Sequence, residues 1–107
     1  MTLNSSKIYT INSITKYEEK SVVSTELIKK ENGTVTMFAF DENEGLSEHS
    51  APFDALVQIV EGKVEIKIDN ECYKLSAGEM IIMPANVPHA LQALTKFKMI
   101  LTMIKSE

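Results

Sequence analysis

Polar and apolar residues alternate along most of the chain, which is the pattern of β-strands that bury one face. The segment 63–68 reads KVEIKI and so places its aliphatic side chains on the same side. Asp69 and Asn70 interrupt the alternation, which resumes over 72–75. Two alternating runs around a short Asp/Asn turn predict an antiparallel hairpin.

Further strands are expected wherever β-branched and aromatic residues run between turn signals. The expected segments are 22–28, 34–40, 55–60, 79–83, 89–93 and 97–104. One more strand is expected to begin at His49, after a polar loop over 41–48, and a single helical turn is expected over 13–19. About eight strands with short turns predict an all-β sandwich or barrel.

Length and composition favour one compact domain. The chain has 107 residues, of which 44% are hydrophobic and 24% charged, as in ordinary globular proteins. Eleven Lys and Arg against fifteen Asp and Glu give a formal net charge of −4. Nucleic acids and anionic membrane surfaces attract clusters of basic residues, and the sequence contains no such cluster. We therefore expect neither kind of partner.

The expected location is the cytoplasm. Cys72 is the only cysteine, so no intramolecular disulfide can form, as is usual in a reducing compartment. Residues 1–10 lack the basic and apolar regions of a signal peptide. No apolar run approaches the roughly 18 residues that a membrane-spanning helix requires.

The chain contains two histidines, His49 and His89, and both lie near expected strand ends. Pro84 and Pro88 frame the turn before His89, and Asn86 between them can adopt a positive φ. A neutral imidazole is the commonest metal ligand near neutral pH, so two that converge could bind a divalent ion. Two ligands are nevertheless fewer than most zinc or iron sites use. The alternative is that each histidine is a half-exposed turn residue.

The spacing around His89 resembles the second motif of the cupin family. That motif is a Gly, five residues, a Pro, one residue, a Gly, two residues, a ligand His, three residues and an Asn. Gly78, Pro84 and His89 occupy their positions in it without a gap. Asn86 replaces the second Gly, which the left-handed backbone region tolerates, and Ala93 replaces the final Asn.

The first cupin motif is present in part. It reads His-x-His, three or four residues, Glu or His, six residues and Gly. Counted back from Gly62, His49 matches the first His. Ala51 replaces the second His, and Ala55 replaces the Glu. The frame of the two motifs covers residues 45–93 and keeps half of the family's four metal ligands.

The resemblance implies a single cupin domain over residues 1–107, built as an antiparallel jelly-roll or double-stranded β-helix barrel. It implies a homodimer, to which N-terminal strands within residues 1–30 contribute. It also implies a divalent metal, either iron, nickel, manganese or zinc, at His49 and His89. Water or substrate would then complete the coordination of that metal.

Replacement of two ligands by alanine makes the expected pocket larger and more apolar, and Ala51 and Ala55 are expected to line it. By alternation along the strands, the other expected wall residues are Val57, Ile59, Ile82 and Leu91. Asp54, Gln58 and Glu48 have the opposite parity, and their side chains are expected to point away.

The six methionines allow two interpretations. Grouped thioethers can form a soft metal site, and methionine is also an adaptable core residue. Met37, Met80, Met83, Met99 and Met103 lie within expected strands, which favours core packing.

Three functions from different classes are compatible with these residues. The leading hypothesis is a small-molecule-binding protein whose apolar pocket carries His49 and His89, with or without a divalent metal. The second is a metal-dependent cupin enzyme, such as a dioxygenase, isomerase or lyase, so whether the chain is an enzyme stays open. The third is a structural or sensory subunit that acts through its dimer surface. The sequence identifies no substrate, because a fold alone does not define one.

Overall fold

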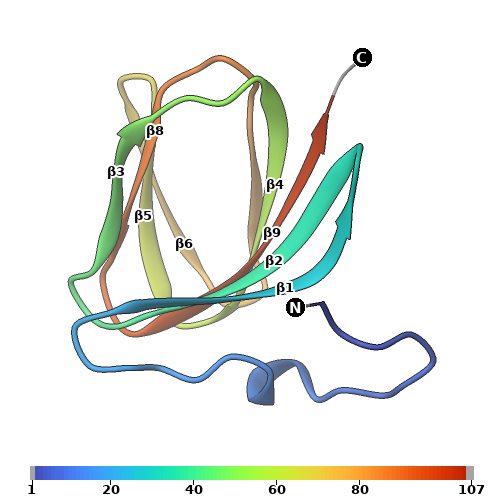
Figure 1. Cartoon of the computed structure of the whole chain (residues 1–107). Coiled ribbons are helices and arrows are strands. Elements are labelled where there is room, and N and C mark those ends of the chain that lie inside the picture. The colour runs from blue at the N-terminus through green and yellow to red at the C-terminus, as the bar shows by residue number, and fades with distance from the viewer. Residues whose placement is uncertain (1, 106–107) are drawn as a thin grey trace.

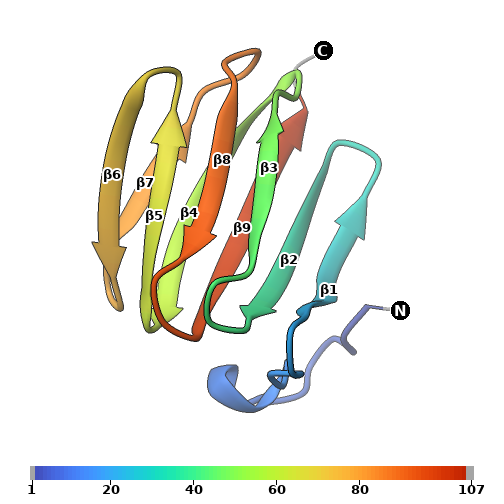
Figure 2. The ribbon, with the colours of Figure 1, turned by 90° about the vertical axis from the view of Figure 1, so that its left-hand side faces the viewer.

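Two antiparallel sheets that face each other form the architecture of residues 2–105, the part of the chain that the computed structural model describes (Figure 1). Their strands are β1 (Val22–Lys30), β2 (Gly33–Phe40), β3 (Gly45–His49), β4 (Phe53–Glu61), β5 (Lys63–Ile68), β6 (Glu71–Ser76), β7 (Met80–Met83), β8 (His89–Ala93) and β9 (Phe97–Lys105). The larger sheet has the order β1-β2-β9-β4-β7 and the smaller one the order β3-β8-β5-β6. Figure 2 shows the smaller sheet in front of the larger. The predicted all-β jelly-roll barrel is confirmed.

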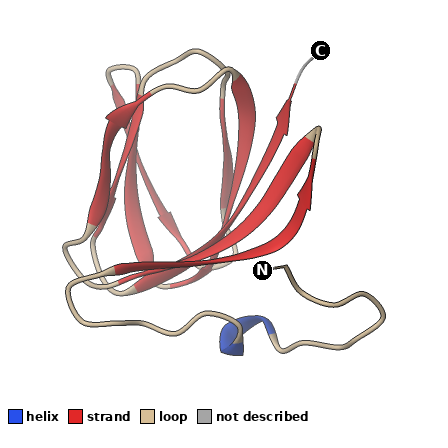
Figure 3. Ribbon diagram, in the orientation of Figure 1, coloured by secondary structure: helices blue, strands red, loops and turns tan. Residues whose placement is uncertain are grey.

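Most of the expected strands are found to within two residues at each end, and three expectations need correction. The loop expected over 41–48 contains β3, so His49 ends a strand instead of beginning one. The helical turn expected over 13–19 is replaced by a 3₁₀ turn at Ile11–Ser13 (Figure 3). Among residues 2–30, strand is present only in β1, so the expected N-terminal strands reduce to one; residue 1 lies outside the described part.

The core lies between the two sheets, where the inward-facing side chains of both sheets meet. Phe40 and Phe97 stack there with ring centroids 4.4 Å apart. Val57 from the larger sheet and Val64 and Ile66 from the smaller are fully buried. Burial of each of these aliphatic side chains contributes roughly 1.5–3 kcal/mol. This packing holds the sheets in the register that positions the site.

The N-terminal segment, residues 2–21, runs across the outer face of the larger sheet (Figure 1). Lys98 on that face donates from Nζ to the carbonyl oxygen of Asn12 over 2.6 Å. The hydroxyl of Tyr17 donates to Oε2 of Glu61 over 2.5 Å. These bonds attach the segment to the barrel. No helix within residues 2–105 has the length and apolar composition needed to cross a membrane.

Candidate functional site

Strands β3 and β8 are neighbours in the smaller sheet, and each carries one histidine. Leu46 pairs with Leu91, and farther along the same ladder His49 pairs with His89. The register shifts by one residue between these two pairs, which is a β-bulge in β3. The bulge changes the parity of the strand, so both imidazoles reach the inner face and line one pocket.

The two imidazoles pack directly against each other. Their ring centroids lie 4.4 Å apart, and the ring planes make an angle of 69°. Nδ1 of His49 lies 2.8 Å from the carbonyl oxygen of Ser47, and Nδ1 of His89 lies 3.2 Å from that of Val87. Because a carbonyl oxygen can only accept a hydrogen bond, each Nδ1 carries a proton and donates. In each neutral ring, Nε2 is therefore the atom with a free lone pair, able to accept a hydrogen bond or bind a metal.

The two histidines differ in burial. His89 is 6% exposed, whereas His49 lies in the exposed part of the site. Burial lowers the pKa of His89, the carbonyl of Val87 offsets part of this effect, and the neighbouring His49 lowers the pKa further. The ring of His89 is therefore uncharged at neutral pH, and its Nε2 can accept a hydrogen bond.

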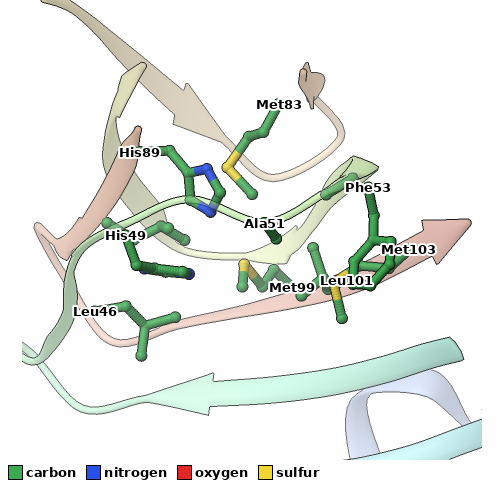
Figure 4. A pocket seen from close by; sticks show the side chains of 11 residues that line it. Leu46, His49, Ala51, Phe53, Met83, His89, Met99, Leu101 and Met103 are labelled. Carbon is green, nitrogen blue, oxygen red and sulfur yellow. The ribbon is translucent and has the colours of Figure 1, made fainter. Parts of the chain in front are cut away.

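A cavity of about 50 Å³ opens beside the two rings (Figure 4). It is lined by Leu46, His49, Ala51, Phe53, Ala55, Met83, His89, Leu91, Met99, Leu101 and Met103. The two imidazoles are the only nitrogen- or oxygen-bearing side chains in this set. Sites for drug-sized ligands usually measure about 300–1,000 Å³, so this cavity encloses only a few heavy atoms.

The expected wall residues lie in three places: the cavity wall, the packed core and the outer face of the barrel. Ala51, Ala55 and Leu91 line the cavity together with the histidines. Val57 and Ile59 face inward but belong to the packed core and do not line the cavity.

Ile82 requires a correction, since its side chain is 62% exposed on the outer face of the barrel. Strand β7 pairs Ile82 with Leu56 and Met83 with Ala55. Directly opposed residues on neighbouring strands share a face, so Met83 is the inward residue of the pair. Met83 is accordingly 3% exposed and lines the cavity.

The other lining residues are not among those expected in the pocket: the methionines are expected in the core, and Leu46, Phe53 and Leu101 have no expected place. Met99, Leu101 and Met103 share one face of β9, and their odd spacing is a period-two signal that could have grouped them. Phe53 begins β4 after the loop that follows His49, and Leu46 lies near the start of β3, separated from His49 by the β-bulge. No alternation extends through such a loop or bulge, so their position depends on the closed barrel.

A double-stranded β-helix barrel with a pocket between its sheets defines a small class of β-barrel proteins. The family described as "Cupin domain" (Cupin_2) matches residues 36–105, and the chain therefore belongs to the cupin family.

Solved structures agree with this assignment. The chain is similar to a conserved protein of unknown function from Streptococcus pyogenes, with 34% identity, a TM-score of 0.93 and coverage of 98% of this chain and 92% of that one. A Cupin 2 conserved barrel domain protein from Leptotrichia buccalis is also 34% identical, with a TM-score of 0.87 over 91% of this chain and 47% of that one. A cupin superfamily protein from Desulfitobacterium hafniense shares the fold at 24% identity, with a TM-score of 0.91 over 97% and 95% of the two chains. No curated protein matches the chain.

The pocket residues do not fit the divalent metal site that the cupin motifs imply. Ala51 and Ala55 stand at two of the ligand positions, and both line the cavity. Within residues 2–105, no group of three or more His, Cys, Asp or Glu side chains could hold an ion. Sites for iron, nickel, manganese or zinc usually take three or more protein ligands, which often include a carboxylate. His49 and His89 supply two imidazole nitrogens and no negative charge.

Proposed function

We propose that this chain is a small-molecule-binding cupin whose apolar pocket holds its ligand through His49 and His89. The observation that carries the proposal is the contact between these two imidazoles, at 4.4 Å, in an otherwise apolar cavity. Binding sites commonly combine apolar walls with a small number of polar groups that orient the ligand. The histidines are the groups that would do so here.

The cavity restricts the chemistry of the ligand. Uncharged His89 accepts a hydrogen bond at Nε2, so the enclosed part of the ligand needs an N–H or O–H group. A volume of about 50 Å³ admits that group with a few carbon atoms. The walls of leucine, methionine and phenylalanine favour an apolar attachment to it. A small amide or alcohol, or the end of a longer ligand bearing such a group, meets these requirements.

Binding of acetamide and isopropanol, followed by NMR of the imidazole nitrogens, tests the proposal. Both probes should shift the Nε2 resonance of His89. Ala51→Leu should abolish this shift, because the new side chain fills the cavity. Ala77→Leu is the matched control, since Ala77 is exposed in the β6–β7 turn and leaves the cavity unchanged. Absence of any shift, or a shift that persists in Ala51→Leu, would contradict the proposal.

We also propose that the chain forms a homodimer through the outer face of the larger sheet. Ile82 and Ile104 are 62% and 65% exposed there and line a groove with Leu56. Asp54 and Lys105 line the same groove. A two-fold contact presents the same surface twice, so each carboxylate could meet the partner's ammonium group while the isoleucines are buried.

The alternative functions make different demands on the pocket. A metal-dependent enzyme of the divalent kind needs a third His, Cys, Asp or Glu ligand, and residues 2–105 bring none of these to His49 and His89. If the chain is a structural subunit, its pocket needs no ligand, and acetamide and isopropanol should leave the Nε2 resonance of His89 unshifted.

We also propose that the protein acts in the cytoplasm. The exposed thiol of Cys72 is compatible with that location.

A further inference from the structure

The cavity beside the histidines is rich in sulfur and contains no side-chain oxygen. Met83 of β7 and Met99 and Met103 of β9 line it together with His49 and His89. Figure 4 shows the sulfur of Met83 next to the ring of His89 and the sulfur of Met99 on the side of His49. Every side-chain donor around this cavity is thus an imidazole nitrogen or a thioether sulfur.

We propose that this pocket, when it holds no organic ligand, binds one copper(I) ion through Nε2 of His49 and His89 and the thioethers of Met83 and Met99. Thioether ligands are soft and select copper(I), whereas magnesium, manganese and other hard ions prefer carboxylate and water oxygens. The disagreement between this pocket and the divalent site of the cupin motifs is therefore a change in the type of ion, from a divalent ion to a soft monovalent one.

Charge supports the monovalent ion. The cavity has apolar walls and no carboxylate, so an ion inside it loses hydration without gaining a negative partner. The Born cost of this transfer rises with the square of the charge, so a monovalent ion pays about one quarter of the cost of a divalent one of equal size. Copper(I) also binds with low coordination numbers, so two imidazoles and two thioethers are enough ligands for it.

The geometry of the rings is compatible with one shared ion. Metal–imidazole nitrogen bonds are about 2.0–2.1 Å long, which places an ion roughly 3.2 Å from each ring centroid. An ion bound to Nε2 of both rings would therefore see the two centroids, 4.4 Å apart, at an angle of about 90°. That angle leaves the opposite side of the ion open to thioethers and differs from the linear two-coordinate arrangement.

The backbone holds both rings in the required tautomer. The carbonyls of Ser47 and Val87 accept a hydrogen bond from Nδ1 of His49 and His89, respectively. Metal-binding histidines commonly donate their second nitrogen to a carbonyl in this way, which orients Nε2 toward the ion. The site therefore needs no change of tautomer when the ion enters.

Anaerobic titration with copper(I), in competition with bicinchoninate, tests the proposal on the full chain. The exposed thiol of Cys72 is itself a copper(I) ligand, so all measurements are repeated in a Cys72→Ser background. We expect one ion per chain in the Cys72→Ser background, and at least one in the wild type. We also expect zinc(II) to bind at least tenfold more weakly.

Methionine variants separate this site from adventitious binding. Met83→Leu combined with Met99→Leu keeps the volume of the core and should lower copper(I) affinity at least tenfold. Met80→Leu is the matched control on the same strand, because Met80 is 66% exposed and does not line the cavity. Binding that disappears with Cys72→Ser, or that is unchanged in the double methionine variant, would overturn the proposal.

A second readout needs no methionine variant. Silver(I) is a redox-inert substitute for copper(I), and in the Cys72→Ser chain it should shift the methyl resonances of Met83 and Met99 while leaving that of Met80 in place. Silver(I) that shifts no pocket methionine would also overturn the proposal. These titrations contain neither acetamide nor isopropanol, so their failure leaves the experiment with those two probes unaffected.

Discussion

The imidazole of His49 stands edge-to-face against that of His89 because β3 contains one extra residue. Without the bulge, regular pairing from Leu46 would place Glu48 opposite His89. With it, Glu48 lies at the surface, 3.8 Å from the ammonium group of Lys67. One local irregularity thus decides whether the pocket contains a second imidazole or a carboxylate.

The metal-free protein should lose stability as the pH falls through the range in which His89 titrates. Burial holds the pKa of His89 below its ordinary value of 6.5 in the folded state. The unfolded chain therefore takes up a proton at a higher pH than the folded chain, so this contribution to stability is complete above about pH 6.5 and is lost below it. Urea denaturation at several pH values should show a weaker pH dependence for His89→Gln than for the wild type. Equal slopes in the two proteins would contradict this prediction.

Loss of the Tyr17 hydroxyl should loosen the N-terminal segment. The hydroxyl donates to Glu61, and burial and this carboxylate raise the pKa of Tyr17, so it stays protonated as a donor at neutral pH. A hydrogen bond to a charged group contributes about 1.5–3 kcal/mol, and we expect Tyr17→Phe to lower the free energy of unfolding by about 1–2 kcal/mol since the pair is only partly buried.

The control for this variant is Tyr9→Phe, because the hydroxyl of Tyr9 only accepts an exposed bond from the backbone of Asn4. Its effect should be below about 0.5 kcal/mol. Hydrogen exchange of residues 10–21 should also become faster in Tyr17→Phe alone. Identical stability of the two variants would show that the bond to Glu61 does not hold the segment.

Two glycines with positive φ should respond differently to alanine. Gly78 has φ of +91° and no atom within 4 Å of an added Cβ, so Gly78→Ala should cost only the backbone strain of about 1–2 kcal/mol. At Gly62 (φ +81°), the added Cβ would lie 2.0 Å from the carbonyl oxygen of Lys96. Gly62→Ala should therefore cost clearly more, or prevent folding. Chemical denaturation compares the two variants, and equal losses would count against the close approach at Gly62.

A charge in the exposed groove should separate the proposed dimer. Ile82→Glu introduces a carboxylate into an apolar contact. Light scattering after size exclusion should therefore show the mass of a monomer for this variant and that of a dimer for the wild type. Lys67→Glu adds the same residue on the smaller sheet and should leave the assembly intact. A wild-type chain that is monomeric at high micromolar concentration would contradict the proposed dimer.

Much of the barrel could be predicted from alternation, because most strands bury one face only. β5 illustrates this: Val64 and Ile66 are buried and the residues between them are not. β7 shows the limit, since its residues 80–83 are all apolar and their phase cannot be read without the partner strand. The inward position of Met83 follows from its pairing with Ala55, which is a long-range contact.

The two histidines of the candidate site were predictable from the sequence, whereas much of the pocket wall and the geometry of the site were not. The motif spacing singled out His49 and His89, while period two alone could not show that both reach one face. The bulge is a backbone feature without a glycine at the extra position, so it leaves no clear mark in the sequence. The packing of the N-terminal segment against the larger sheet could not be predicted either, because its contacts join residues far apart in the chain.

Ala51 and Ala55 line the cavity at the positions where the cupin motifs carry a histidine and a glutamate. The backbone that would present those side chains is already in place around the pocket. Two point substitutions, Ala51→His and Ala55→Glu, would surround the same space with four ligating groups. The evolutionary distance between this barrel and one with the full divalent ligand set of the cupin motifs is therefore two codons.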